Sequence, residues 1–118
     1  MEKYQEIYNA FMDKYNKIET TPAEAGETLA RIAGIFPNYN MAMIRAERAY
    51  AIVHKNIAES TDETTGKSMS SSKADTVADA TPEATAFKEA RGEVANIEML
   101  IGALKFLQRS LETEYLSS

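Results

Sequence analysis

Apolar positions three and four residues apart run along most of the chain, and this spacing predicts helices. In residues 2–18 the apolar side chains share one face of such a helix, and the charged side chains lie off it. The apolar positions are Tyr4, Ile7, Tyr8, Phe11, Tyr15 and Ile18. No useful length of sequence alternates apolar and polar residues, as a half-buried strand would. The pattern therefore predicts an all-α fold.

Two Thr-Pro pairs indicate where further helices begin. Thr21 precedes Pro22, and Thr81 precedes Pro82. A threonine side chain can accept a hydrogen bond from the first free N–H groups of a helix. Proline suits the first helical position, because an N–H there would have no partner within the helix. Glu24, three residues after Thr21, completes the pattern of a capping box.

Pro37 predicts a break in the first of these helices. The residue before a proline is disfavoured in the helical region, so this helix is expected to end near Phe36. Residues 36–40 are then a turn, and Asn38 or Asn40 caps the helix that follows.

The remaining sequence predicts an antiparallel helical hairpin, formed by about 41–59 and 82–116, with two N-terminal helices packed on it. The apolar seam of the first long helix consists of Met43, Ala46, Tyr50, Val53 and Ile57. The seam of the second consists of Phe87, Ala90, Val94, Ile97, Ile101, Leu104, Gln108, Leu111 and Tyr115. Both seams follow a heptad-like repeat. Residues 60–81 form a polar connection within a single domain, 1–118, with room for a short helix at 73–80 after Ser72.

The two long helices have unequal lengths, and this predicts self-association. If they pair antiparallel, Met41 lies opposite about residue 103, and residues 104–116 extend beyond the partner. Residues 97–107 are also apolar on more than one side. Soluble monomers rarely expose such a surface, so we expect a homo-oligomer, most simply a symmetric dimer. The candidate self-association residues are Ile101, Leu104, Gln108, Leu111 and Tyr115.

Polar and small residues interrupt the seam of the second helix. Gln108 can set register or oligomeric state, as polar seam residues do in coiled coils, or it lies where the seam meets solvent. Gly92 and Gly102 each cost about 1 kcal/mol in a helix interior. They either allow another helix to approach closely or are tolerated.

Composition narrows the possible classes of protein. The chain has 118 residues, a net charge of −5 and no cysteine, which excludes disulfides, thiolate metal sites and cysteine nucleophiles. The acidic balance argues against a protein that coats nucleic acid generally. The longest apolar run, 97–107, is too short to span a membrane, and the N-terminal residues lack the apolar stretch of a signal peptide. We expect a soluble cytoplasmic protein with no membrane partner.

Neither of two possible reaction centres has the residues that its chemistry needs. Gly66-Lys67-Ser68 resembles the end of a phosphate-binding loop, but Thr61 stands where that loop has its first glycine, and no strand precedes it. This segment is interpreted as a linker. His54 is the single histidine, and Ala51 stands where a di-metal bundle has glutamate. We therefore expect no catalytic residue, no metal, no cofactor and no enzyme.

Arg45, Arg48 and Lys55 form a basic stripe on helix 41–59, with His54 beside it. Lys105 and Arg109 could extend the stripe across the hairpin. Cations in such an array can contact nucleic-acid phosphates. Alternatively, they pair with acids of the facing helix, such as Glu89, Glu93 and Glu98.

Residues 41–60 and 81–115, separated by the polar connection, resemble a group of small helical proteins encoded by tailed phages and prophages. The resemblance is carried by Ala46, Glu47 and Tyr50 in the first helix and by 88–90 and 109–112 in the second. These phage proteins are often encoded near replication and recombination genes, mostly without an assigned activity. The resemblance covers about two-thirds of the chain, excludes the N-terminal 36 residues and supplies no catalytic residue.

The sequence thus predicts a non-enzymatic, helical, self-associating interaction protein. The resemblance implies a phage accessory factor in the host cytoplasm, with a protein partner. Two alternatives stay open. One is a nucleic-acid-binding accessory of phage replication or recombination that uses Arg45, Arg48 and Lys55. The other is a small-ligand-binding anti-defence protein with pockets between subunits.

Overall fold

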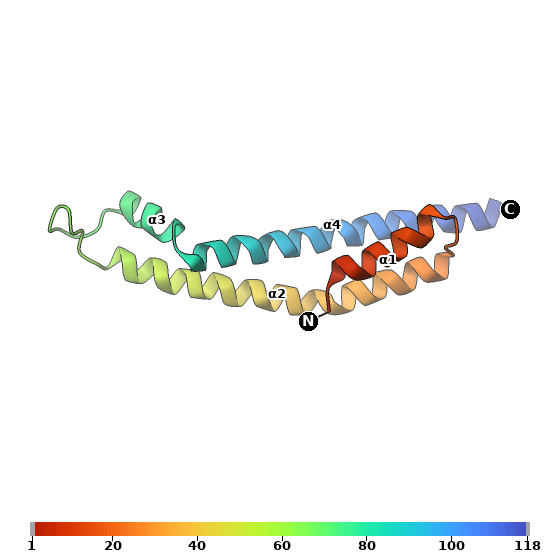
Figure 1. Ribbon diagram of the computed structural model, residues 1–118, viewed down its shortest axis with the longest axis horizontal. Coiled ribbons are helices and arrows are strands. Elements are labelled where there is room, and N and C mark those ends of the chain that lie inside the picture. The colour runs from red at the N-terminus through yellow and green to blue at the C-terminus, as the bar shows by residue number, and fades with distance from the viewer. Residues whose placement is uncertain (1, 118) are drawn as a thin grey trace. The chain divides into compact units, whose positions relative to one another are not determined.

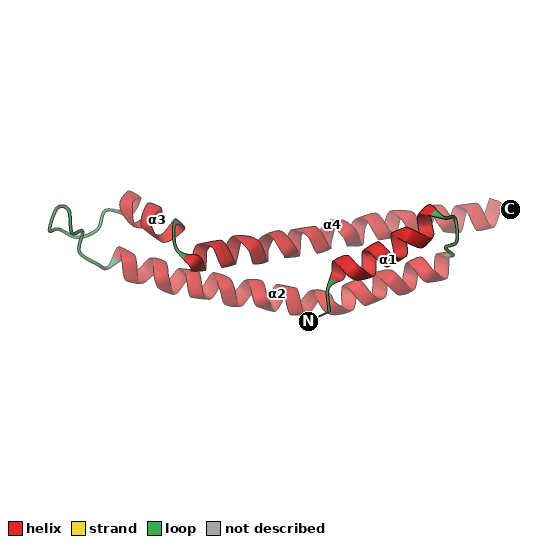
Figure 2. Ribbon diagram, in the orientation of Figure 1, coloured by secondary structure: helices red, strands yellow, loops and turns green. Residues whose placement is uncertain are grey.

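The chain is all-helical across residues 2–117, the part that the computed structural model describes, with side chains described for residues 2–116 (Figures 1 and 2). The helices in chain order are α1 (Tyr4–Asn16), α2 (Pro22–Ala58), α3 (Ser71–Asp79) and α4 (Pro82–Ser117). Outside the helices, Thr61 and Ser68 pair as an isolated β-bridge. The predicted all-α class is confirmed, and the hairpin arrangement stays a prediction.

Both Thr-Pro pairs begin helices as predicted. The backbone N–H of Glu24 donates to Oγ1 of Thr21 at 3.2 Å, and the N–H of Ala84 donates to Oγ1 of Thr81 at 3.3 Å. Each threonine side chain therefore satisfies one of the first N–H groups of its helix. The Thr81 hydroxyl also donates to the Ala78 carbonyl at 2.6 Å, which connects the start of α4 to the end of α3.

The predicted turn at 36–40 is wrong, because α2 continues through Pro37 to Ala58. Asn38 and Asn40 lie inside this helix and do not cap a new one. Proline removes one backbone hydrogen bond and clashes with the carbonyl four residues earlier, at a cost of about 3 kcal/mol. Ile32 and Tyr39 are buried on either side of the proline. Burial of a large side chain contributes about 1.5–3 kcal/mol, so packing offsets the local cost.

The chain divides into two compact units, which share α2 and α4. Unit 1 takes the described part of Met1–Tyr39 and Val94–Ser118, and unit 2 takes Asn40–Glu93. The core of unit 1 consists of Tyr4, Ile7, Phe11, Ala25, Ile32, Tyr39, Val94, Ile97, Leu104 and Leu111. Because both long helices run through both units, the predicted single domain stays a prediction.

Ile18 lies outside the buried face that the sequence predicted for it. α1 ends at Asn16, and Ile18 has a positive φ of 59° and is 93% exposed. Its N–H donates to the Tyr15 carbonyl at 3.0 Å, and the N–H of Glu19 donates to the Lys14 carbonyl at 3.0 Å. This pair of hydrogen bonds terminates a helix through a left-handed residue, a position that glycine usually occupies. The chain reversal after α1 therefore turns the isoleucine side chain outward.

In unit 2 the second half of α2 contacts the first turns of α4. The rings of Tyr50 and Phe87 stack with centroids 6.0 Å apart and an interplanar angle of 28°. The register expected from the sequence would place Tyr50 about two helical turns farther along α4, near Val94. A heptad seam presents equivalent faces every seven residues, so the repeat alone does not distinguish these two registers.

The polar connection is an ordered turn centred on Asp62. The Asp62 N–H donates to the Lys67 carbonyl at 2.7 Å, and the Gly66 N–H donates to the Asp62 carbonyl at 2.7 Å. Gly66 has a φ of 71°, which glycine adopts without steric cost. The helix α2 precedes this turn, so the turn lacks the strand context of a phosphate-binding loop. α3 begins at Ser71, capped by Ser70, two residues earlier than predicted.

Candidate functional site

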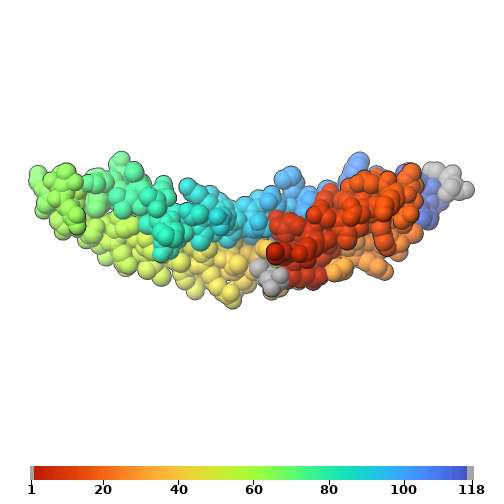
Figure 3. Space-filling view, in the orientation of Figure 1, coloured from red at the N-terminus to blue at the C-terminus, as the bar shows by residue number. Residues whose placement is uncertain are grey.

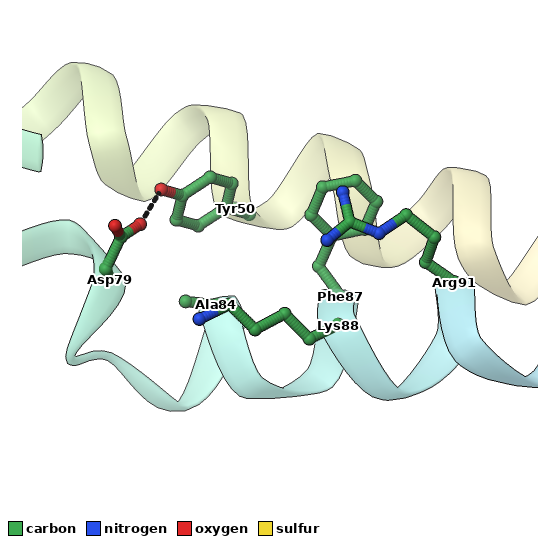
Figure 4. A pocket seen from close by; sticks show the side chains of 6 residues that line it. All are labelled: Tyr50, Asp79, Ala84, Phe87, Lys88 and Arg91. Carbon is green, nitrogen blue, oxygen red and sulfur yellow. Dashed lines mark hydrogen bonds between the residues drawn. The ribbon is translucent and has the colours of Figure 1, made fainter.

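Unit 2 contains a small pocket with an aromatic wall (Figure 4). Its volume is about 170 Å³, and its lining comes from α2, α3 and α4. The lining residues are Tyr50, Asp79, Ala84, Phe87, Lys88 and Arg91. Helical periodicity predicted Tyr50 and Phe87 as seam residues, but it did not predict that Asp79 would lie beside them.

Tyr50 and Asp79 form the polar end of this pocket. The tyrosine hydroxyl donates to Oδ1 of Asp79 at 2.5 Å (Figure 4). That hydrogen bond, together with burial and the negative charges of Asp79 and Asp75, raises the pKa of Tyr50 above its ordinary value. The hydroxyl therefore stays protonated and acts as a hydrogen-bond donor, not as a base.

His54 makes a second contact between α2 and α3, one helical turn from Tyr50. Its Nε2 lies 2.7 Å from Oδ1 of Asp75, and its ring meets the Tyr50 ring edge-on with centroids 6.1 Å apart. Tyr50 and His54 on α2 thus contact Asp79 and Asp75 on α3. Together these two contacts hold α3 against α2.

Two cations of α4 lie at the rim of the pocket. The Arg91 guanidinium carbon is 5.0 Å from the centroid of the Phe87 ring, within range of a cation–π interaction. In Figure 4 the Lys88 side chain extends past Ala84 toward the end of the pocket where Asp79 lies. The pocket thus combines two aromatic rings with two cations and the Asp79 carboxylate.

The three residues of the basic stripe, Arg45, Arg48 and Lys55, are all exposed. None of them has an ion pair within residues 2–116, so the expected pairing with acids of the facing helix is absent there. Lys105 and Arg109, which were expected to extend the stripe, belong to unit 1. The stripe therefore presents free cations to solvent.

Exposed aliphatic side chains share the helix face of these cations, which the sequence analysis did not anticipate. Met41, Ile44 and Ile52 are 47%, 37% and 55% exposed. At 100° per residue they share an arc of about 100° with the three cations. We call this surface the α2 face: Met41, Ile44, Arg45, Arg48, Ile52 and Lys55. In Figure 3 the second half of α2, yellow to light green, runs along one edge of unit 2.

Two of the five predicted self-association residues lie in the core of unit 1. Leu104 is fully buried, Leu111 is 5% exposed, and Ile101 is partly buried. Gln108 packs beside Gly26, where an added Cβ would lie 3.0 Å from its Nε2. Among the five candidates Tyr115 is exposed. Leu104 and Leu111 are therefore covered within unit 1.

Within residues 97–107 two large apolar side chains stay exposed. Met99 and Phe106, seven residues apart on α4, are 69% and 68% exposed. They are the part of this stretch for which unit 1 provides no cover.

Over the described residues no three His, Asp or Glu side chains are grouped to hold a metal ion. None of the helices described is both long enough and apolar enough to cross a membrane. Comparison of the chain with protein-family models, curated proteins and solved structures finds no match.

Proposed function

We propose that the protein is a non-enzymatic, self-associating interaction protein and that the α2 face is its docking surface. One observation carries this proposal: three cations without ion pairs in the described chain share a single helix face with three exposed aliphatic side chains. The seam of the same helix, including Tyr50, lies on the opposite side of α2. The α2 face therefore has no role in the core of unit 2.

The composition of the α2 face suits protein binding. Burial of aliphatic surface contributes about 25 cal/mol per Å², and this term supplies affinity. Cations at the same surface accelerate the encounter with an acidic partner and select against basic partners. Ile44 and Ile52 share the face with these cations, so a partner needs both an apolar and an acidic component to match.

A helical hairpin would present this face on a rigid support, and antiparallel pairing of α2 with the start of α4 is part of the proposal. The Tyr50–Phe87 stack supports it, and so do the Tyr50–Asp79 and His54–Asp75 contacts. A preformed surface loses little conformational entropy on binding, which favours affinity.

The resemblance to small phage proteins suggests a setting for this activity. In that setting the chain is an accessory factor of a tailed phage in the host cytoplasm, and it acts by assembly and by contact with other proteins. Residues 41–60, which carry part of the resemblance, include the whole α2 face.

Sedimentation velocity over a wide range of protein concentration tests this proposal. We expect the wild-type chain to associate, and we expect Ile44→Ser with Ile52→Ser to abolish association without loss of helicity. Lys105→Glu, an exposed charge change in unit 1, is the control and should leave association intact. A wild-type chain that stays monomeric into the millimolar range would overturn the proposal.

Binding of nucleic acid is the second candidate function, and the same free cations favour it. Three phosphate contacts would give a slope of about −2.7 in a plot of log affinity against log salt concentration for duplex DNA. Substitution of Ile44 and Ile52 by serine leaves the three cations in place. Retained DNA binding and lost self-association in that variant would show that the two activities separate.

Binding of a small ligand is the third candidate, and the pocket beside Tyr50 and Phe87 supports it. This pocket lies within unit 2, whereas the sequence analysis anticipated pockets between subunits. Nuclear magnetic resonance with small aromatic carboxylates as probes tests it. Shifts confined to Phe87, Lys88 and their neighbours would favour this function.

A further inference from the structure

The α2 face is poorly suited to a symmetric contact with the same face of a second copy. A twofold axis through a helix face places that face opposite itself. Arg48 lies near the middle of the α2 face, with Arg45 and Lys55 on either side of it in sequence. Such an interface would bring cations together, and like charges at a contact are unfavourable. A second copy must therefore present a different, acidic surface.

The outward side of α4 in unit 2 is such a surface. Thr85, Ala86, Glu89 and Gly92 are exposed there, and with Glu93 they occupy an arc of about 120°. We call this surface the α4 face: Thr85, Ala86, Glu89, Gly92 and Glu93. Glu89 has no ion pair within the described chain. Neither lysine nor arginine lies within this arc, so its charge is purely acidic.

The shapes of the two faces also differ in a complementary way. No atom lies within 4 Å of a Cβ built on Gly92, so this glycine does not serve a close contact inside the chain. Glycine costs a helix about 1 kcal/mol relative to alanine, and nothing within the unit compensates that cost at this position. Room above Gly92 and Ala86 can accept an aliphatic side chain such as Ile44 or Ile52.

We infer that the α2 face of one copy docks on the α4 face of the next, with cations toward Glu89 and Glu93 and aliphatic side chains over Gly92 and Ala86. This inference rests on the proposed function and names the occupant of its docking surface. Two different faces make a head-to-tail contact, which leaves one face of each kind free at the ends. Association then continues with concentration, in place of the symmetric dimer expected from the sequence.

Two variants, each with one blocked face, test this inference. Arg45→Glu with Arg48→Glu makes the α2 face acidic and leaves the α4 face intact. Gly92→Leu fills the room on the α4 face and leaves the α2 face intact. Leucine is a better helix former than glycine, so loss of association in this variant would not come from loss of the helix. Gly102→Leu, at an equally open glycine of α4 in unit 1, is the matched control.

Sedimentation equilibrium separates the outcomes. We expect the wild type and the Gly102→Leu control to grow in mass with concentration. Each blocked variant alone should be a monomer, and an equal mixture of the two should stop at twice the chain mass, because one intact face of each kind meets. Raised salt should weaken that mixed pair.

Some results would contradict the head-to-tail contact and leave the proposed function in place. Others would contradict the proposed docking surface as well. A wild-type mass that reaches a plateau at two chains shows a symmetric dimer and contradicts the head-to-tail contact. Unchanged growth of the Gly92→Leu variant shows that the α2 face docks elsewhere. Association that is lost in Met99→Ser with Phe106→Ser, and kept when the α2 face is altered, removes the proposed docking surface itself. A wild-type monomer at all concentrations removes both proposals.

Discussion

The hydroxyl of Tyr50 donates a hydrogen bond of 2.5 Å to Oδ1 of Asp79, and this contact joins the middle of the second half of α2 to the last residue of α3. His54 and Asp75 repeat the arrangement one turn away. Two polar contacts therefore position a nine-residue helix that is too short to be stable alone.

Ionisation of Tyr50 should release α3 at high pH. The folded-state pKa of Tyr50 is raised, so its neutral form is favoured in the folded chain. The stability that this contributes is fully present below the unfolded-state pKa of about 10 and is lost as pH rises through the folded-state pKa. We expect Tyr50→Phe to lose this pH dependence.

The difference in ultraviolet absorbance between the wild type and Tyr50→Phe, followed through the alkaline range, gives the titration of Tyr50 itself. Tyr8→Phe, a substitution in α1, is the control. A Tyr50 titration centred at or below the value of a free tyrosine would contradict the hydrogen bond to Asp79.

Asp62 should make the connection between α2 and α3 sensitive to acid. The Lys73 ammonium donates to Oδ1 of Asp62 at 2.7 Å, and the Thr64 N–H donates to the same oxygen at 2.9 Å. These hydrogen bonds lower the pKa of Asp62 in the folded chain. Its contribution to stability is present above the unfolded-state pKa of about 3.9 and is lost as pH falls through the lower folded-state pKa.

Asp62→Asn should therefore lower the melting temperature at neutral pH and flatten its decline in acid. Calorimetry from neutral pH to below pH 4 measures both effects. Glu63→Gln, at the exposed neighbouring position, should change neither. Parallel acid profiles of Asp62→Asn and the wild type would show that Lys73 does not hold the Asp62 carboxylate.

Thr81 should stabilise the junction of α3 and α4 through both of its side-chain hydrogen bonds. Thr81→Ala removes the N-terminal cap of α4 and the bond to the Ala78 carbonyl. Loss of an N-cap costs about 1 kcal/mol. Urea unfolding measures the change, with Thr85→Ala on the exposed side of α4 as the control. An equal effect of the two substitutions would contradict the capping role.

Leu104 and Leu111, which the sequence analysis named as candidate self-association residues, should act on folding. Both side chains are buried within unit 1. Leu104→Ala should cost about 2–5 kcal/mol, as large-to-small changes in a core do. Phe106→Ala, on the exposed side of α4, should change stability by no more than about 0.5 kcal/mol. Equal effects of these two substitutions on urea unfolding would contradict the burial pattern.

Helical periodicity and the Thr-Pro pairs were sufficient to predict the fold class, the start of α2 and the whole of α4. Each of these signals is local: a cap and its helix lie within four residues of each other. The seam positions Val94, Ile97 and Leu104 are buried for the same reason, because the period of the pattern determines which face is apolar.

The pairing register of α2 with α4 and the burial of residues 104–116 were not predictable in the same way. A heptad repeat permits Tyr50 to meet Phe87 or a residue seven positions away, and only the whole unit decides between them. The sequence also suggested that residues 104–116 lacked a partner. Continuation of α2 back to Pro22 supplies one, as the contact between Gly26 and Gln108 shows. Self-association through Ile101, Leu104, Gln108, Leu111 and Tyr115 stays a prediction, although Leu104 and Leu111 are buried within unit 1.

The sequence analysis identified the three cations of the α2 face but not its three exposed aliphatic side chains. Arg45, Arg48 and Lys55 stood out because charge is visible in any sequence. Met41, Ile44 and Ile52 did not, because an apolar residue on a helix is ordinarily assigned to the core. Whether these three side chains are exposed depends on which face of α2 packs against α4. The stacking of Tyr50 on Phe87 identifies that face.

Pro37 gives the sharpest test of how the two halves of α2 are connected. In a continuous helix, Pro37→Ala restores the hydrogen bond to the Ala33 carbonyl and removes the clash of the ring with it, so the substitution should stabilise the protein by up to about 3 kcal/mol. If residues 36–40 were a turn, the same substitution would loosen that turn and would stabilise nothing. Pro22→Ala, at the first position of α2 where no N–H partner is lost, is the matched control and should have little effect. Urea unfolding of the two variants decides the matter, and a fall in stability of Pro37→Ala would show that α2 is interrupted there.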